Sequence, residues 1–118
     1  MSISTILAVD DEALILFSIA DELREAGYSV IEASNAASAL RKLESHAEIS
    51  VLFTDVNMPG EMDGLQLSAI VRQRWPQIKI IVTSGKFYPG FGGLLDTVFI
   101  PKPYDIRIIS ATIEQLVN

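Results

Sequence analysis

Short apolar runs recur along the chain and alternate with segments whose apolar residues have helical spacing. Five runs have the length of strands, at residues 6–9, 28–31, 51–53, 78–82 and 98–100. Three of them are apolar throughout, and the fourth is interrupted only by Lys79. Such runs are typical of strands covered on both faces, as in a parallel sheet.

Four segments have the periodicity of helices that pack against this sheet. The first stops at Gly27, a residue favoured just after a helix, and the second begins near Asn35, a suitable N-cap. The third ends near Trp75, because Pro76 disfavours helix in the residue before it. We expect the following residues to face the core: Ala13, Leu16, Phe17, Ala20 and Leu23 in the first helix, Ala36, Leu40 and Leu43 in the second, Leu67, Ile70 and Val71 in the third, and Ile106, Ile109, Ile113 and Leu116 in the last.

The pattern fails between the fourth and fifth runs. Residues 85–96 contain four glycines and Pro89, which oppose a stable helix, so we expect a loop with at most one turn near Leu94 and Leu95. The remaining alternation predicts one domain over residues 1–118 with a doubly wound α/β fold. Ligands of such folds bind beyond the carboxyl ends of the strands.

Composition excludes several classes of function. The net charge of −6 opposes direct binding to nucleic acid, and the absence of cysteine excludes thiol chemistry and disulfides. The run at residues 6–9 is too short for a membrane span or a signal peptide. We therefore expect a soluble, cytoplasmic protein that binds neither nucleic acid nor membrane.

The predicted strand ends carry the residues with chemistry. Asp10, Asp11 and Glu12 follow the first strand, Asp55 ends the third, Thr83 and Ser84 end the fourth, and Lys102 follows the fifth. Two carboxylates about 4 Å apart repel by roughly 4 kcal/mol at an effective dielectric near 20, so the cluster calls for a cation. Oxygen ligands without nearby His or Cys favour Mg²⁺; the lone His46 lies away from this edge.

Carboxylate-bound Mg²⁺ beside a hydroxyl and a lysine is suited to a phosphoryl group. The candidate nucleophiles are Asp11, Asp55, Thr83 and Ser84. A carboxylate needs no deprotonation at neutral pH and can form an aspartyl-phosphate. We favour Asp55, because it ends the central strand and stands apart from the paired Asp10 and Asp11.

Four motifs together resemble the receiver domain of bacterial two-component response regulators, in particular stand-alone receivers of the chemotaxis type. They are Val9-Asp10-Asp11-Glu12, Asp55-x-x-Met58-Pro59 with Met62-Asp63-Gly64, Val82-Thr83-Ser84-Gly85, and Phe99-x-x-Lys102-Pro103. The resemblance covers essentially the whole chain and implies a flavodoxin-like sheet in the order 2-1-3-4-5. It also implies a signalling domain rather than an enzyme.

The resemblance assigns a role to each matching position. Asp55 is the implied phosphoacceptor. Mg²⁺ is bound by Asp11, Asp55 and the main-chain carbonyl of Asn57, with Asp10 acting through water. Thr83, Ser84 and Lys102 bind the phosphoryl group, Phe99 is the switch aromatic residue, and the peptide before Pro103 is cis.

The chain departs from the family pattern in three places. Gly60 and Glu61 provide one extra residue after the Met58-Pro59 pair, and Phe99 stands where tyrosine is usual. The stretch from Thr83 to Lys102 is shorter than usual by about one helical turn, which predicts a degenerate or shortened fourth helix. We expect that residues 86–94 become more ordered on phosphorylation; a permanently ordered loop is the alternative.

Three alternative functions fit the sequence less well. A Mg²⁺-dependent phosphatase of the haloacid dehalogenase type uses an acid two residues after its nucleophile, where this chain has Asn57. A flavodoxin-like cofactor module binds phosphate with hydroxyls and main-chain amides after the first strand, where this chain has Asp10, Asp11 and Glu12, which repel phosphate unless a metal intervenes. A degenerate receiver would lack the acidic, hydroxyl or lysine positions found here.

The resemblance also implies the partners. A sensor histidine kinase or a phosphotransfer protein would supply the phosphoryl group, and an unknown downstream protein would read it. The chain would act as a monomer or weak dimer, as a motility component, a phosphorelay intermediate or a phosphate sink.

Overall fold

A five-stranded parallel sheet forms the centre of the molecule. The computed structural model describes residues 4–58, 60–85 and 97–117. The strands are β1 (Thr5–Val9), β2 (Ser29–Ala33), β3 (Ile49–Asp55), β4 (Lys79–Ser84) and β5 (Thr97–Pro101), and they lie in the order β2-β1-β3-β4-β5. This order and the parallel pairing confirm the predicted flavodoxin-like, doubly wound α/β fold.

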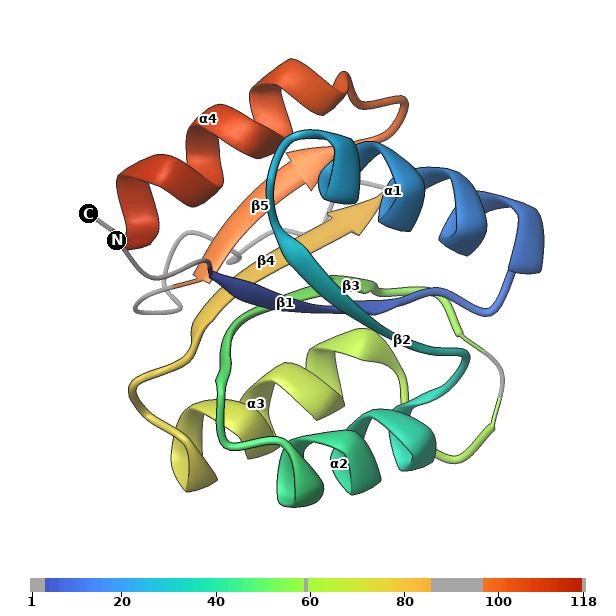
Figure 1. The fold of residues 1–118 in the computed structure, drawn as a ribbon. Helices are drawn as coiled ribbons and strands as arrows, with labels where there is room; N and C mark the ends of the chain where they lie inside the picture. Colours follow the sequence, from blue (N-terminus) through green and yellow to red (C-terminus); the bar gives the residue numbers. More distant parts are fainter. Residues whose placement is uncertain (1–3, 59, 86–96, 118) are drawn as a thin grey trace.

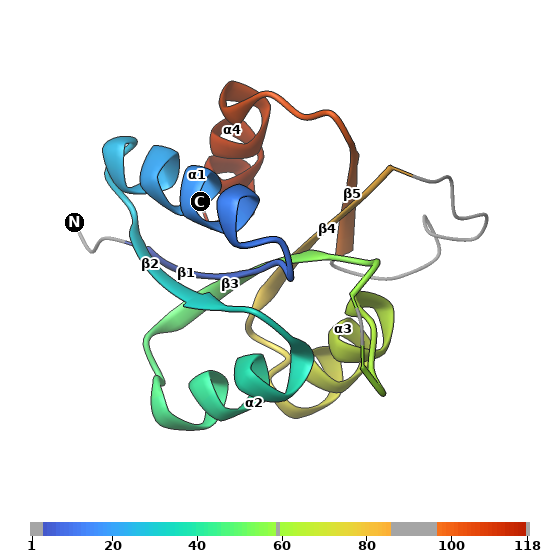
Figure 2. The ribbon, with the colours of Figure 1, turned by 90° about the vertical axis from the view of Figure 1, so that its right-hand side faces the viewer.

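Helices cover both faces of the sheet (Figures 1 and 2). α1 (Ala13–Glu25) and α4 (Ile106–Val117) pack on one face, and α2 (Ala36–Ser45) and α3 (Gly64–Arg74) on the other. Alternate residues of a strand therefore enter different cores: Ile6 and Ala8 lie on the side of α1 and α4, whereas Leu7 and Val9 lie on the side of α2 and α3. This two-sided burial explains why the strands are apolar throughout.

The helix ends follow the local sequence. Gly27 has a positive φ of 102° directly after the last turn of α1, and the Asn35 side chain accepts a 2.7 Å hydrogen bond from the Ser38 amide at the start of α2. α3 begins with a reciprocal capping box between Asp63 and Gln66, and Trp75 is its C-cap. The predicted ends at Gly27, Asn35 and Trp75 are confirmed.

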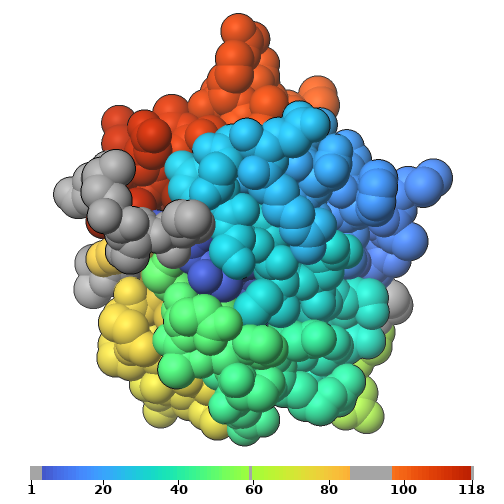
Figure 3. Space-filling model, in the orientation of Figure 1, coloured from blue at the N-terminus to red at the C-terminus, as the bar shows by residue number. Residues whose placement is uncertain are grey.

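The predicted buried face of α1 is partly wrong. Leu16, Ala20 and Leu23 are buried as expected, but Phe17 is 66% exposed and Ala13 is also exposed. The buried stripe runs through Leu16, Ile19, Ala20 and Leu23, at i, i+3, i+4 and i+7, and Phe17 lies about 100° from Leu16 around the helix. Figure 3 shows the first turns of α1, in blue, projecting from the surface.

Two expectations concern residues that the structure does not describe. The shortened fourth helix and the ordering of residues 86–94 both fall in the segment 86–96, outside the described residues. Within the described ranges, no helix has the length and apolar character needed to cross a bilayer.

Candidate functional site

The carboxyl ends of β1, β3 and β4 bring the predicted site residues together. Asp10 follows β1, whose last residue Val9 pairs with Thr54, and the next residue of β3 is Asp55. Asp55 pairs in turn with Thr83 of β4. Because the three strands are parallel neighbours, residues far apart in the sequence meet at one edge of the sheet.

Three carboxylates form the centre of this edge. Oxygen atoms of Asp10, Asp11 and Asp55 all lie within 4.8 Å of one another, with Asp10 and Asp55 buried and Asp11 exposed. Backbone amides orient the two buried groups. The Glu12 amide donates a 2.9 Å hydrogen bond to Asp10 Oδ1, and the Asn57 amide donates a 3.2 Å bond to Asp55 Oδ1.

Lys102 supplies positive charge to the cluster. Its Nζ lies 3.2 Å from Asp55 Oδ2 and 3.9 Å from Asp10 Oδ2. The Lys102 amide donates a 2.9 Å bond to the Ser84 carbonyl, which holds the backbone of this segment beside β4. The following peptide, Lys102–Pro103, is cis.

One ammonium group does not balance the three carboxylates. The pKa of Asp10 is raised above its usual value, mainly because burial removes the carboxylate from water, and the nearby charges of Asp55 and Asp11 add to the increase. The Glu12 amide and Lys102 oppose this effect but do not cancel it. The donor set therefore fits a hard divalent cation, for which carboxylate oxygens are preferred ligands.

The two hydroxyls at the end of β4 differ in their contacts. Ser84 Oγ accepts a 3.1 Å hydrogen bond from Asn57 Nδ2. Thr83 is fully buried, and its Oγ1 has no hydrogen-bond partner among the residues described here. An unsatisfied buried hydroxyl costs about 1–3 kcal/mol, so Thr83 is suited to bind an added ligand beside Asp55.

Phe99 lies apart from the carboxylates, on the face of the sheet covered by α2 and α3. It is half-buried and packs against the core on that side. Its neighbour in the sheet is Val82, one residue before Thr83.

Two residues of the site have roles that the sequence did not reveal. A Cβ on Gly64 would overlap the carbonyl oxygen of Asp55, so the start of α3 packs directly on the backbone of the site. Tyr104 packs edge-on against Phe53, with ring centroids 5.6 Å apart and an interplanar angle of 88°. The position of Tyr104 in the sequence, directly after Lys102-Pro103, was the signal that could have pointed to it.

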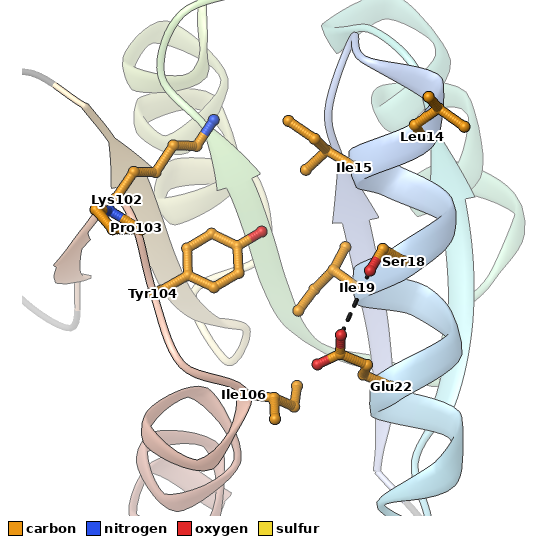
Figure 4. A pocket seen from close by; sticks show the side chains of 9 residues that line it. All are labelled: Leu14, Ile15, Ser18, Ile19, Glu22, Lys102, Pro103, Tyr104 and Ile106. Carbon is orange, nitrogen blue, oxygen red and sulfur yellow. Dashed lines mark hydrogen bonds between the residues drawn. The ribbon is translucent and has the colours of Figure 1, made fainter.

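A pocket opens beside Lys102, between α1 and the segment that leads into α4 (Figure 4). Its volume is about 570 Å³, and it is lined by Leu14, Ile15, Ser18, Ile19, Glu22, Lys102, Pro103, Tyr104 and Ile106. Burial, together with the charges of Asp10, Asp55 and Glu22, raises the pKa of Tyr104 to about 12. The Tyr104 hydroxyl therefore stays protonated beside the acidic cluster at physiological pH.

Two curated relatives match nearly the whole of this chain in sequence. The chain is 32% identical over 120 residues to the sensor kinase CckA of Brucella abortus, covering 98% of this chain but only 13% of that protein. It is also 32% identical to the response regulator receiver protein CpdR of the same species, covering 94% of this chain and 93% of CpdR. The match thus spans a small part of the kinase and nearly all of CpdR.

Solved structures agree with these relatives. A response regulator receiver protein from Sinorhizobium medicae matches with a TM-score of 0.90 and 30% identity, covering 99% of this chain and 96% of that one. The response regulator TrrA from Thermotoga maritima, crystallised in complex with Mg²⁺ and BeF, matches with a TM-score of 0.82 and 27% identity, over 97% and 99% of the two chains.

The family match locates the motifs of the site within a known domain. Residues 6–88 match the response regulator receiver domain, and this span contains Asp10, Asp11, Asp55 and Thr83. Together with strand order 2-1-3-4-5 and the cluster of carboxylates, the match shows that this chain belongs to the receiver domains of two-component response regulators.

Proposed function

We propose that Asp55 accepts a phosphoryl group in a Mg²⁺-dependent reaction and that the phosphorylated chain signals through contacts with other proteins. The single observation that carries this proposal is the convergence of Asp55, two further carboxylates and Lys102 at one strand edge. The Mg²⁺–BeF complex of TrrA supports it, since that receiver is 27% identical and has the same fold.

Asp11, Asp55 and the Asn57 carbonyl would bind Mg²⁺ directly, and Asp10 would bind it through water. When bound, Mg²⁺ neutralises negative charge on the oxygens of the phosphoryl group. The buried, unpartnered Thr83 hydroxyl would donate a hydrogen bond to one of those oxygens. Lys102, already 3.2 Å from Asp55, would transfer its contact to the phosphoryl group.

The transfer step forms one bond and breaks another. A carboxylate oxygen of Asp55 attacks phosphorus, and the bond between phosphorus and the imidazole nitrogen of a phosphohistidine breaks. The electron pair of that bond leaves with the imidazole. The donor is a sensor histidine kinase or a phosphotransfer protein, and roles as a phosphorelay intermediate or phosphate sink use the same step.

Acetyl phosphate tests the assignment without a partner protein. Incubation with acetyl phosphate and Mg²⁺ should add the mass of one phosphoryl group, and Asp55→Asn should abolish the addition. Asp21→Asn, which makes the same charge change on the exposed surface of α1, serves as the matched control. Labelling that persists in Asp55→Asn would place the acceptor elsewhere.

Phosphotransfer from purified histidine kinases then identifies the donor. A cognate kinase should label the wild type within seconds to minutes and leave Asp55→Asn unlabelled. Steady turnover of a phosphomonoester substrate would instead support the phosphatase alternative, for which Asn57 lacks the required titratable group.

A further inference from the structure

The Tyr104 ring connects the segment that carries Lys102 to the strand that carries Asp55. The ring packs edge-on against Phe53, two residues before Asp55 in β3. Tyr104 itself lies two residues after Lys102 and belongs to the half-buried residues around the core of α1 and α4. The contact therefore spans the same two segments as the ion pair between Lys102 and Asp55.

The sheet alone does not hold the Lys102 segment after β5 ends. Within the described ranges, the backbone bond from this segment to β4 that lies furthest along the chain runs from the Lys102 amide to the Ser84 carbonyl. Figure 4 shows the Lys102 side chain and the Tyr104 ring extending in the same direction, into the space that faces α1. The pocket beside them leaves room for either side chain to move if its packing is lost.

We propose that Tyr104 is a positioning residue whose ring holds the Lys102 ammonium group beside Asp55 and thereby tunes both Mg²⁺ binding and phosphoryl acceptance. The proposal rests on the proposed function of Asp55. The ring carries the role, because the Tyr104 hydroxyl makes no hydrogen bond within the described part of the chain, whereas its ring contacts Phe53.

The Mg²⁺ affinity distinguishes a positioning role of Tyr104 from general damage to the site, because the two predict changes in opposite directions. The Lys102 ammonium repels a cation bound at Asp55, so a variant that lets Lys102 move away should bind Mg²⁺ more tightly. We expect Tyr104→Leu to lower the Mg²⁺ dissociation constant by about threefold or more in isothermal titration calorimetry. It should also slow phosphorylation by acetyl phosphate. An unchanged or weaker affinity for Mg²⁺ would overturn the proposal, since damage to the carboxylates weakens binding.

Two further variants control for the loss of an aromatic ring. Tyr28 packs against the same core, and its hydroxyl donates a 3.4 Å hydrogen bond to the Ser110 carbonyl, away from the carboxylates. Tyr28→Leu should lower stability without tightening Mg²⁺ binding. Tyr104→Phe keeps the ring and should retain the wild-type Mg²⁺ affinity. Tighter binding in this variant would assign the effect to the hydroxyl and contradict the proposal.

A metal-free measurement separates this proposal from the proposed function. If the wild type binds no Mg²⁺ and is not phosphorylated, the proposed function fails, and urea unfolding in metal-free buffer still tests Tyr104. The fall in the urea midpoint caused by Tyr104→Leu should be smaller in a Lys102→Met background, because the two residues act on one ion pair. Equal shifts in both backgrounds would show that Tyr104 acts independently of Lys102.

Discussion

Replacing Gly64 with alanine should disturb the proposed phosphoacceptor site through the backbone. The added Cβ would overlap the Asp55 carbonyl oxygen and lie 2.8 Å from the Asp55 carbonyl carbon and 2.9 Å from Val56 Cα. All three atoms belong to the backbone, so no side-chain rotation can relieve the contact. The start of α3 must therefore move away from the end of β3.

The expected cost follows from the contacts that this movement disturbs. Overpacking a close contact costs typically 1–3 kcal/mol, and losing the 2.9 Å hydrogen bond from the Gly64 amide to the Val56 carbonyl adds about 1 kcal/mol. The smaller conformational entropy of unfolded alanine returns roughly 0.4–1 kcal/mol. The net destabilisation should be about 1–3.5 kcal/mol.

Urea unfolding and phosphorylation by acetyl phosphate measure the two effects. Gly64→Ala should lower the unfolding free energy by the amount above and slow phosphorylation of Asp55. Gly85→Ala is the matched control, because a Cβ on this glycine meets no described atom within 4 Å. The reasoning is refuted if Gly64→Ala is as stable as Gly85→Ala and reacts at the wild-type rate.

Three further predictions concern the charges and surface of the site. In Mg²⁺-free buffer, Asp10→Asn should raise the free energy of unfolding at neutral pH, because the raised pKa of Asp10 makes its ionised form costly in the folded protein. Since the folded pKa lies above the unfolded one, this gain should disappear as pH falls toward about 3.8. Urea midpoints that differ equally at every pH would contradict the prediction. Asp11→Ala should weaken Mg²⁺ binding, measured by calorimetry, more than Asp10→Ala, and equal losses would contradict direct ligation by Asp11. Phe17→Ser should slow phosphotransfer from a cognate kinase several-fold while leaving acetyl phosphate labelling unchanged. The reason is that Phe17 and Leu14 are 66% and 85% exposed and Leu14 lines the pocket beside Lys102. Slowing of both reactions would instead indicate damage to the site.

The sequence predicted the sheet well because each strand is buried on both faces. The five apolar runs correspond to β1–β5, although every strand starts or ends one or more residues away from its run. The predicted topology was then sufficient to place Asp10, Asp55 and Thr83 at one edge of the sheet, with no information on their contacts. Parallel pairing converts sequence position directly into spatial position, so the candidate site could be assembled from strand ends alone.

Helix orientation and close packing were harder to predict. Phe17 has the spacing of a core residue, but periodicity does not decide which edge of an apolar stripe meets the sheet, and Phe17 lies on the exposed edge. Gly64 was part of a motif, yet the need for glycine at this position comes from a close contact with the Asp55 backbone, which forms only when α3 packs against β3. Tyr104 depends in the same way on a tertiary contact with Phe53.

The electrostatics of the site give a physical reason to link the two parts of the proposed function, Mg²⁺ binding and phosphoryl acceptance. Asp10 and Asp55 have side chains only 5% and 4% exposed, and among the described residues the cation paired with them is the single ammonium of Lys102. The carboxylate oxygens lie within 4.8 Å of one another, and two charges at that distance interact by about 3–4 kcal/mol at an effective dielectric near 20, so Lys102 can offset one carboxylate but not three. A divalent cation removes that remaining repulsion, whereas a phosphoryl group alone would add to it. On the proposed function, Mg²⁺ would therefore bind before phosphoryl transfer, and Lys102 would then be able to exchange Asp55 for the incoming group.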